Sequence, residues 1–214
     1  AGVFQNMDEV RAYKNADGTL IQPNAVPGDV RFVDVNNDGK ITQEGDMTKI
    51  GKGMPDWTFG LNFNADWRGF DFSMMWQGVT GAEVFDATRR TDISKANLPS
   101  WMLGRWTGEG TSNKYPRFCT VDTHNNWLSS DLYVSDASYF RLKNIQLGYS
   151  LPKNIINKFY VDRIRVYVSA ENLLTFTKYH GFDPEISSGG TSLGVDYGVY
   201  PQARTFMIGV NVGF

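Results

Sequence analysis

The chain has little of what enzymes and disulfide-linked domains depend on. Among its 214 residues Cys119 is the single cysteine, so no disulfide can form within the chain. The two histidines, His124 and His180, fit neither H-x-x-x-H nor H-E-x-x-H, and the nucleophile motif G-x-S-x-G does not occur. Because these motifs carry much metal-dependent and nucleophilic hydrolysis, their absence predicts that the protein is not an enzyme.

The sequence also has neither a large excess of one charge sign nor a long apolar run. The formal net charge is −2, so bulk electrostatics favour neither nucleic acid nor an anionic surface as a partner. No run of about 18 apolar residues occurs, which excludes a transmembrane helix. A membrane-spanning strand stays compatible with the sequence, because alternating apolar and polar residues average out in a hydropathy window.

What the chain does have is segments with one apolar face, most clearly in its last eleven residues, 204–214. From Phe206 onward, the side chains of one parity are all apolar: Phe206, Ile208, Val210, Val212 and Phe214. The other parity is small or polar except for Met207. Successive side chains of a strand point to opposite faces, and a tilted strand of about 9–11 residues crosses a bilayer. The pattern therefore predicts a strand of an outer-membrane β-barrel, whose apolar face points into lipid.

Four further ranges alternate in the same way: 57–67, 70–78, 138–151 and 163–173. In the third, the parity changes near Lys143 and Asn144, which predicts a β-bulge. The side chains predicted to face lipid are Trp57, Phe59, Phe63, Trp67, Phe72, Val166, Val168, Phe206, Ile208, Val210 and Phe214. We therefore expect an all-β fold, an antiparallel segment of a transmembrane barrel.

The connections between these ranges alternate in length. A tight Arg68-Gly69 turn and a short link, 152–162, alternate with two long segments, 79–137 and 175–203. Bacterial outer-membrane barrels have short periplasmic turns and long extracellular loops. We therefore predict that 79–137, 175–203 and the N-terminal region 1–56 are extracellular, and that the strand-bearing part is 57–214, with its C-terminus in the periplasm.

Two tryptophans give a check on length. Trp57 and Trp67 share a parity and lie ten residues apart. At about 3.3 Å per residue and a tilt of about 35–45°, that separation spans about 25 Å along the membrane normal, the height of the apolar band of a barrel. A soluble strand that buries this face in a sandwich core is the alternative. Because barrels begin at about eight strands, further strands must come from other chains or from a longer polypeptide.

The N-terminal region contains an EF-hand-like loop at 34–46, which fits the D-x-[DN]-x-[DN]-G start of a calcium loop. The expected calcium ligands are Asp34, Asn36, Asp38, the Lys40 carbonyl, Thr42 through a water, and Asp46. Gly45 stands where a bidentate carboxylate belongs, so a one-residue bulge would have to bring in Asp46. The alternative is an Asn-Asp-Gly turn with solvated carboxylates. Bound Ca²⁺ would stiffen an extracellular loop.

Several stretches resemble the C-terminal part of the SusC/RagA family of TonB-dependent outer-membrane transporters of Bacteroidetes. They are PGDVRFVDVNNDGKIT at 27–42, GFDF at 69–72, QGVTG at 77–81, SYFRLKNIQLGYSLP at 138–152, RVYVSAENLLTFT at 165–177, GFDPE at 181–185 and YPQARTF at 200–206. The resemblance covers most of the chain in the expected order. Only the region 84–126 shows no such pattern, as expected of a variable extracellular loop.

The resemblance implies a plugged barrel of about 22 strands in the bacterial outer membrane, of which this chain supplies about five. It implies import of oligosaccharides or peptides together with a SusD-like surface lipoprotein that acts as a lid. It also implies that TonB delivers energy through an N-terminal plug, which this chain lacks. The expected partners are therefore the remainder of the barrel and plug, the lipoprotein, TonB and the lipid bilayer, with no nucleic acid. A soluble carbohydrate-binding β-sandwich is the alternative.

Three tryptophans in the segment 79–137 are candidates for contact with a ligand or with the lid: Trp101, Trp106 and Trp127. Aromatic faces suit carbohydrate or peptide surfaces. Packing of these side chains inside the segment itself is the alternative, and the sequence leaves both open.

Overall fold

The computed structural model describes residues 2–88, 97–156, 161–186 and 193–214. The chain forms two compact units, one made of Ala1–Gly51 and Thr88–Val134, the other of Lys52–Ala87 and Ser135–Phe214. Strands and irregular segments dominate, and the helices are short. None of the helices in the described ranges has the length and hydropathy needed to cross a membrane.

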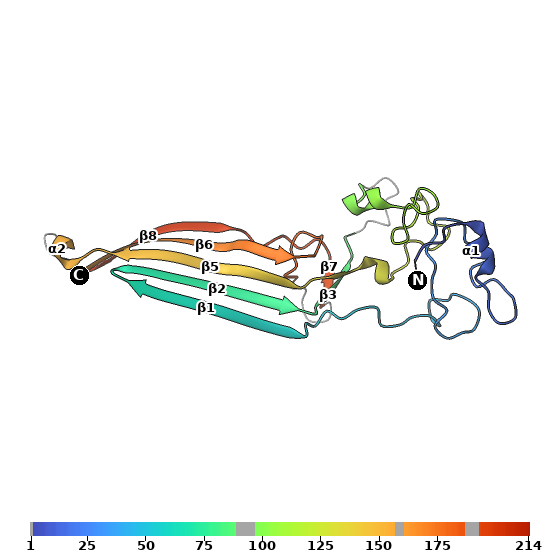
Figure 1. Cartoon of the computed structure of the whole chain (residues 1–214), viewed down its shortest axis with the longest axis horizontal. Coiled ribbons are helices and arrows are strands. Elements are labelled where there is room, and N and C mark those ends of the chain that lie inside the picture. Colours follow the sequence, from blue (N-terminus) through green and yellow to red (C-terminus); the bar gives the residue numbers. More distant parts are fainter. Residues whose placement is uncertain (1, 89–96, 157–160, 187–192) are drawn as a thin grey trace. The chain divides into compact units, whose positions relative to one another are not determined.

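The second unit is built on a five-stranded antiparallel sheet in the order β1-β2-β5-β6-β8, whose strands lie side by side in Figure 1. Its strands are β1 Trp57–Trp67, β2 Phe70–Thr80, β5 Tyr139–Ser150, β6 Arg163–Thr177 and β8 Thr205–Gly213. They match the ranges that alternate in the sequence to within one residue at each end, except that β2 and β6 run further, to Thr80 and Thr177. The regular secondary structure of the described residues is thus mostly strand, as expected.

Two local irregularities shape this sheet. Arg68 and Gly69 form the β1–β2 turn with φ of 48° and 90°. Two left-handed residues are typical of the hairpin turns that match strand twist, although a non-glycine residue there costs about 1–2 kcal/mol. In β5 the register with β6 shifts between Leu142 and Asn144. This irregularity lies where the parity of the sequence changes, and it lets both halves of β5 keep their apolar side chains on one face.

The segments that connect β2 to β5 and β6 to β8 contain strands and packed side chains close to the five-stranded sheet. β3 Glu83–Asp86, β4 Val134–Asp136 and β7 Val195–Asp196 form a three-stranded sheet in the order β4-β3-β7. A hydrophobic core cluster lies where these segments join the five-stranded sheet. Its members are Val79, Ala82, Val84, Ala137, Tyr139 and Tyr179, with Ile186 packed against them. The segments predicted as loops, 79–137 and 175–203, therefore contain strands and a core. Between β5 and β6 lies the short helix α2 Lys153–Ile156.

The first unit joins two segments that are distant in the sequence. Helix α1 Met7–Ala12 begins at Asn6, whose side chain accepts hydrogen bonds from the Asp8 and Glu9 amides. A hydrophobic core cluster of this unit consists of Phe4, Val10 and Ala25, with Tyr13 packed against them. Two short 3₁₀ turns, η1 Ser100–Gly104 and η2 Asp131–Tyr133, belong to the second segment. The division predicted from sequence, with 1–56 apart from 79–137, differs from this arrangement because buried polar contacts tie the two segments together.

Candidate functional site

The register of the five strands gathers the apolar side chains on one face of the sheet. Residues directly opposite each other in neighbouring strands share a face. One row across all five strands consists of Ala65, Phe72, Leu147, Val168 and Ile208. The rows on either side of it are Phe63, Met74, Ile145, Ala170 and Phe206, and Trp67, Phe70, Tyr149, Val166 and Val210. We call this surface the apolar face.

The apolar face is open. Of the eleven side chains predicted to face lipid, Phe72 is half-buried and the other ten are exposed, with Phe206 at 71% and Ile208 at 78% exposure. Soluble monomers rarely expose contiguous apolar patches beyond a few hundred Å². Such a surface therefore needs an apolar partner.

Aromatic rings gather at both ends of the apolar face. Next to the long connections, Trp76 stacks on Phe140 with ring centroids 4.6 Å apart, and Phe59 and Phe176 lie 6.0 Å from Phe140 and 6.3 Å from Trp76 respectively. Near the β1–β2 turn, Phe70 and Tyr149 are 4.6 Å apart. Aromatic girdles at both borders of an apolar band are typical of membrane barrels.

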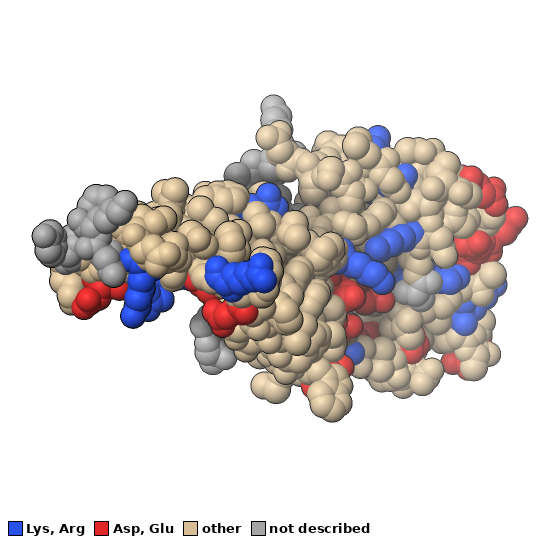
Figure 2. All heavy atoms as spheres, turned by 60° about the vertical axis from the view of Figure 1, so that its left-hand side comes forward, with Lys and Arg blue, Asp and Glu red and all other residues tan. Residues whose placement is uncertain are grey.

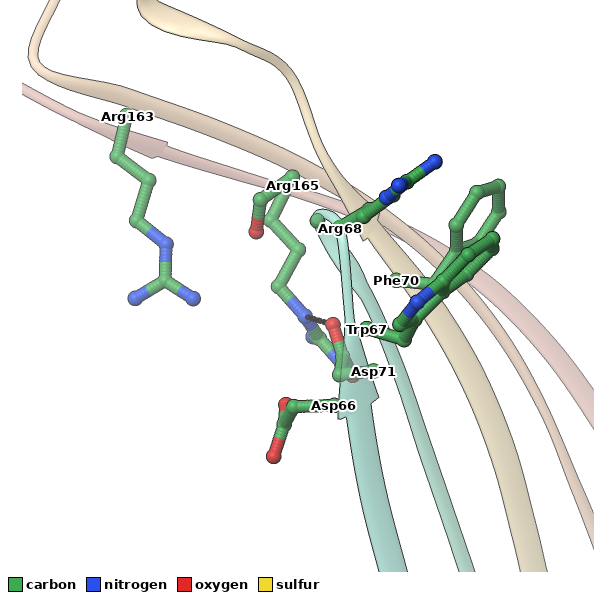
Figure 3. Close-up of a pocket in the computed structure, with 9 residues that line it drawn as sticks. Asp66, Trp67, Arg68, Phe70, Asp71, Arg163 and Arg165 are labelled. Atoms are coloured by element: carbon green, nitrogen blue, oxygen red, sulfur yellow. Dashed lines mark hydrogen bonds and ion pairs between the residues drawn. The ribbon is translucent and has the colours of Figure 1, made fainter.

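The opposite face of the sheet is polar, and its charges gather near the β1–β2 turn. There Arg165 donates from Nε to Asp71 Oδ1 at 2.8 Å and pairs with the same carboxylate through Nη2. Asp66 and Arg163 extend to the same side of the strands as this pair and line a pocket of about 380 Å³ with it (Figure 3). At the end of the sheet that comes forward in Figure 2, Lys and Arg side chains lie beside Asp and Glu side chains. Neither sign dominates, so this end suits a partner with charges of both signs.

A buried ion cluster on the polar face fixes the segment after β6. Arg141 is only 2% exposed and donates to Asp183 at 2.6 Å, to Glu185 at 2.7 Å and to the Thr175 hydroxyl at 2.9 Å. Lys143 adds a second cation, 2.6 Å from Glu185. The sequence alone does not separate a ligand role from an internal role for these acids. The structure gives Asp183 and Glu185 an internal role.

The protonation of Asp183 follows from these contacts. Burial raises the pKa of Asp183, but hydrogen bonds from Arg141 and from the Gln202 and Glu185 amides outweigh it, so the pKa lies below its usual value. The carboxylate is therefore charged and paired at neutral pH.

The three tryptophans of the segment 79–137 are half-buried in the first unit. The Trp101 ring stacks on Tyr115 with centroids 4.8 Å apart. The indole N–H of Trp106 is buried and lacks a hydrogen-bond partner among the described residues. Trp127 donates its amide to Asp122 at 2.7 Å. These contacts support the packing alternative, and a role in ligand or lid contact stays a prediction.

The same unit contains a polar cluster around Asp29, which is fully buried. Its carboxylate accepts from Arg117 Nε at 2.7 Å and from Asn126 at 2.8 Å, and His124 Nδ1 lies 2.6 Å away. The Val26 amide donates to it at 2.9 Å. Because the partners come from both segments, this carboxylate joins them. Sequence reasoning missed it, since nothing local marks Asp29 as buried.

We expect this cluster to make the first unit acid-sensitive. Burial raises the pKa of Asp29, but the hydrogen bonds from Asn126, Val26, His124 and Arg117 together lower it below 3.8. A depressed folded-state pKa gives stability that is present above about pH 4 and is lost as the pH falls through the folded-state pKa. Asp29→Asn should therefore cost about 2 kcal/mol at pH 7 and less at pH 3, measured by urea unfolding of this unit. Asp17→Asn, an exposed carboxylate, is the control; equal pH dependence of wild type and Asp29→Asn would contradict the expectation.

The EF-hand-like loop is closed by its own carboxylates. Asp34 accepts from the Gly39 amide at 2.7 Å, and Asp46 accepts from Val35 at 2.8 Å and Thr42 at 2.7 Å. The hydrogen bonds from the Thr42 and Val35 amides lower the pKa of Asp46. The Asp46 side chain thus lies against the backbone of the loop. Among the residues that the structure describes, no group of three or more His, Cys, Asp or Glu side chains is placed to hold a metal. Calcium binding stays a prediction.

Comparison with known proteins gives the family. The chain is 35% identical over 196 residues to TonB-dependent receptor P3 of Formosa agariphila, covering 88% of this chain and 19% of that protein. It is 30% identical over 193 residues to TonB-dependent receptor SusC of Bacteroides thetaiotaomicron, covering 89% of this chain and 18% of that protein. No protein-family model matches the sequence. The chain thus spans about a fifth of the length of these relatives.

Solved structures agree. The fold is similar to a chain of the RagAB peptide importer in its open-open state, with a TM-score of 0.65 and 25% identity over 88% of this chain and 20% of that chain. The names of these relatives are those of receptors and transporters, not of enzymes. The chain belongs to the SusC/RagA family of TonB-dependent outer-membrane receptors.

Proposed function

We propose that this chain forms part of the barrel wall of an active outer-membrane importer for oligosaccharides or peptides. The observation that carries the proposal is the set of uninterrupted apolar rows on one face of the sheet, with charged and polar side chains on the other. In a membrane barrel the first face meets lipid and the second lines the interior. The relatives support an importer, since one structural neighbour is a peptide importer.

The barrel is completed from outside this chain. Within the part of the chain that the structure describes, β1 pairs only with β2 in the five-stranded sheet, and β8 only with β6. An unpaired strand edge in hydrocarbon costs several kcal/mol for each unsatisfied backbone group. The two open edges therefore pair with further strands of a barrel of about 22 strands, which also encloses a plug. The charged end of the polar face, with Asp66 and Arg163, faces that plug.

The long connections lie on the cell surface in this proposal. They meet a SusD-like lipoprotein that closes over the substrate, and TonB acts from the periplasm through the plug. We expect the receptor to require detergent for extraction, because the apolar face is open. Release into buffer by salt alone would favour the alternative, a soluble carbohydrate-binding sandwich.

Uptake by cells tests the import activity. A strain that lacks the receptor should fail to accumulate labelled oligosaccharides or peptides too large for porins, and re-expression should restore uptake. Loss of TonB should abolish uptake equally, whereas entry of a small porin substrate should not change. Uptake without the receptor or without TonB would contradict the proposed function.

We also propose that the loop 34–46 binds Ca²⁺ through Asp34, Asn36, Asp38, the Lys40 carbonyl, Thr42 and Asp46. Calcium at about a hundredfold excess over its Kd should then stabilise the first unit by about 2.7 kcal/mol. The measurement is thermal unfolding with Ca²⁺ and with a chelator. Exchange of both Asp34 and Asp38 for Ala should remove the calcium-dependent part, and Asp17→Ala should not. An unchanged calcium response in the double variant would reject the site.

A further inference from the structure

The two faces of the sheet separate clearly at the β1–β2 turn. In Figure 3 the side chains of Trp67, Arg68 and Phe70 extend to one side of the strands, and those of Asp71 and Arg165 to the other. The first group continues the apolar face, since Trp67, Phe70 and Tyr149 are consecutive members of one row. Arg68 therefore sits at the border of the apolar face.

Arg68 is held in a defined place. Its guanidinium carbon lies 5.0 Å from the centroid of the Trp67 ring, within the range of a cation–π contact. The Trp67 ring is itself 66% exposed, so this pair projects from the sheet. The left-handed backbone of Arg68, with φ of 48°, suits Asn or Gly better than Arg. An arginine at this position therefore has a local backbone cost that its side-chain contacts must offset.

Among the residues that the structure describes, no ion pair or hydrogen bond neutralises the guanidinium of Arg68. The nearby carboxylate of Asp71 lies on the opposite face and is taken by Arg165. A guanidinium with five N–H donors is thus presented beside an exposed indole, at the edge of an apolar surface.

We propose that Arg68 and Trp67 bind the phosphodiester group of a membrane phospholipid at the periplasmic border of the barrel. Guanidinium pairs with phosphate through two parallel hydrogen bonds, and indole rings sit at headgroup level in membranes. The apolar face, from the row of Trp67, Phe70 and Tyr149 onward, receives the acyl chains of the same lipid, which a free phosphate would lack. This site rests on the proposed function, because it requires the apolar face to meet lipid.

The test uses the full-length receptor purified in detergent and titrated with phosphatidylglycerol, with bound lipid counted by native mass spectrometry. Arg68→Asn creates an Asn-Gly turn, which favours the hairpin, so the fold is kept while the guanidinium is removed. We expect lipid binding to weaken about tenfold, as for the loss of a charged hydrogen bond. The control is Arg163→Asn, at the same end but on the polar face, and it should leave lipid binding unchanged.

Glycerol 3-phosphate distinguishes a lipid from a free phosphate. It should not displace the bound lipid, because it lacks acyl chains; displacement at equal concentration would overturn the assignment to a phospholipid. Unchanged lipid binding in Arg68→Asn would overturn the site as a whole. If Arg68→Asn has no effect while an arginine in the middle of the apolar face still destabilises the receptor, this proposal fails and the proposed function stands.

Discussion

Val210→Arg is expected to lower the free energy of unfolding of the membrane-inserted receptor by about 2–4 kcal/mol. Val210 lies on the apolar face opposite Val166, midway between Phe206 and Phe214 along the C-terminal strand. At about 3.3 Å per residue this places it near the middle of an apolar band of about 25 Å. Because barrel strands tilt by about 35–45°, the row that Val210 shares with Trp67 changes depth from one strand to the next. A charge is most costly at that depth. Urea unfolding of the receptor in phospholipid vesicles measures the effect.

The neighbouring residue provides the matched control. Asn211 lies on the polar face opposite Arg165, so Asn211→Arg adds the same side chain to the other side of the same strand. Like charges directly opposite in a sheet cost about 0.2–1 kcal/mol, so this variant should be clearly milder than Val210→Arg. Equal losses in both variants would mean that the two faces meet similar surroundings, and the membrane-facing assignment would then be wrong.

Arg141→Met is the second substitution with a large expected effect. It removes the only cation that contacts the Asp183 carboxylate among the described residues, whereas Glu185 keeps Lys143. Breaking a buried ion pair at one partner costs about 3–5 kcal/mol, because the other charge stays buried without compensation. The expected result is a loss of this size in urea unfolding, with earlier proteolysis of the segment after β6.

A double variant separates charge from packing. Asp183→Asn combined with Arg141→Met removes the uncompensated charge, so it should recover part of the loss. Arg11→Met, at an exposed arginine, should stay within about 0.5 kcal/mol of wild type. If the double variant is no more stable than Arg141→Met, the cluster contributes through packing and not through charge.

The strands could be predicted from sequence because one physical requirement dominates them. A strand with one face in hydrocarbon must alternate with period two, and β1 does so from Trp57 to Trp67 without a break. The predicted strands were too short where the chain leaves the region with one face in hydrocarbon. At their C-terminal ends, β2 and β6 lie next to a local core that includes buried Val79 and Tyr139. Strand pairing therefore continues to Thr80 and Thr177, although the alternation of apolar and polar residues is weaker there.

The polar contacts could not be predicted, because their partners lie far apart in the sequence. Arg141 meets Asp183 across 42 residues, and Asp29 meets His124 across 95. Each residue taken alone looks like an ordinary solvated charge. The same holds for the union of the N-terminal region with the segment 97–134, which depends on the buried Asp29. A buried carboxylate has no local sequence signal, whereas an apolar face has one in every second residue.

The apolar face can be tested most directly along the C-terminal strand. Nitroxide labels placed one at a time from Phe206 to Phe214, in a receptor freed of native cysteines and inserted in vesicles, report collisions with oxygen and with a water-soluble nickel complex. We predict high oxygen and low nickel accessibility at Phe206, Ile208, Val210 and Val212, and the reverse tendency or general protection at the residues between them. Low accessibility to both reagents at Val210 would show that this face is buried in protein, which would contradict its contact with the membrane.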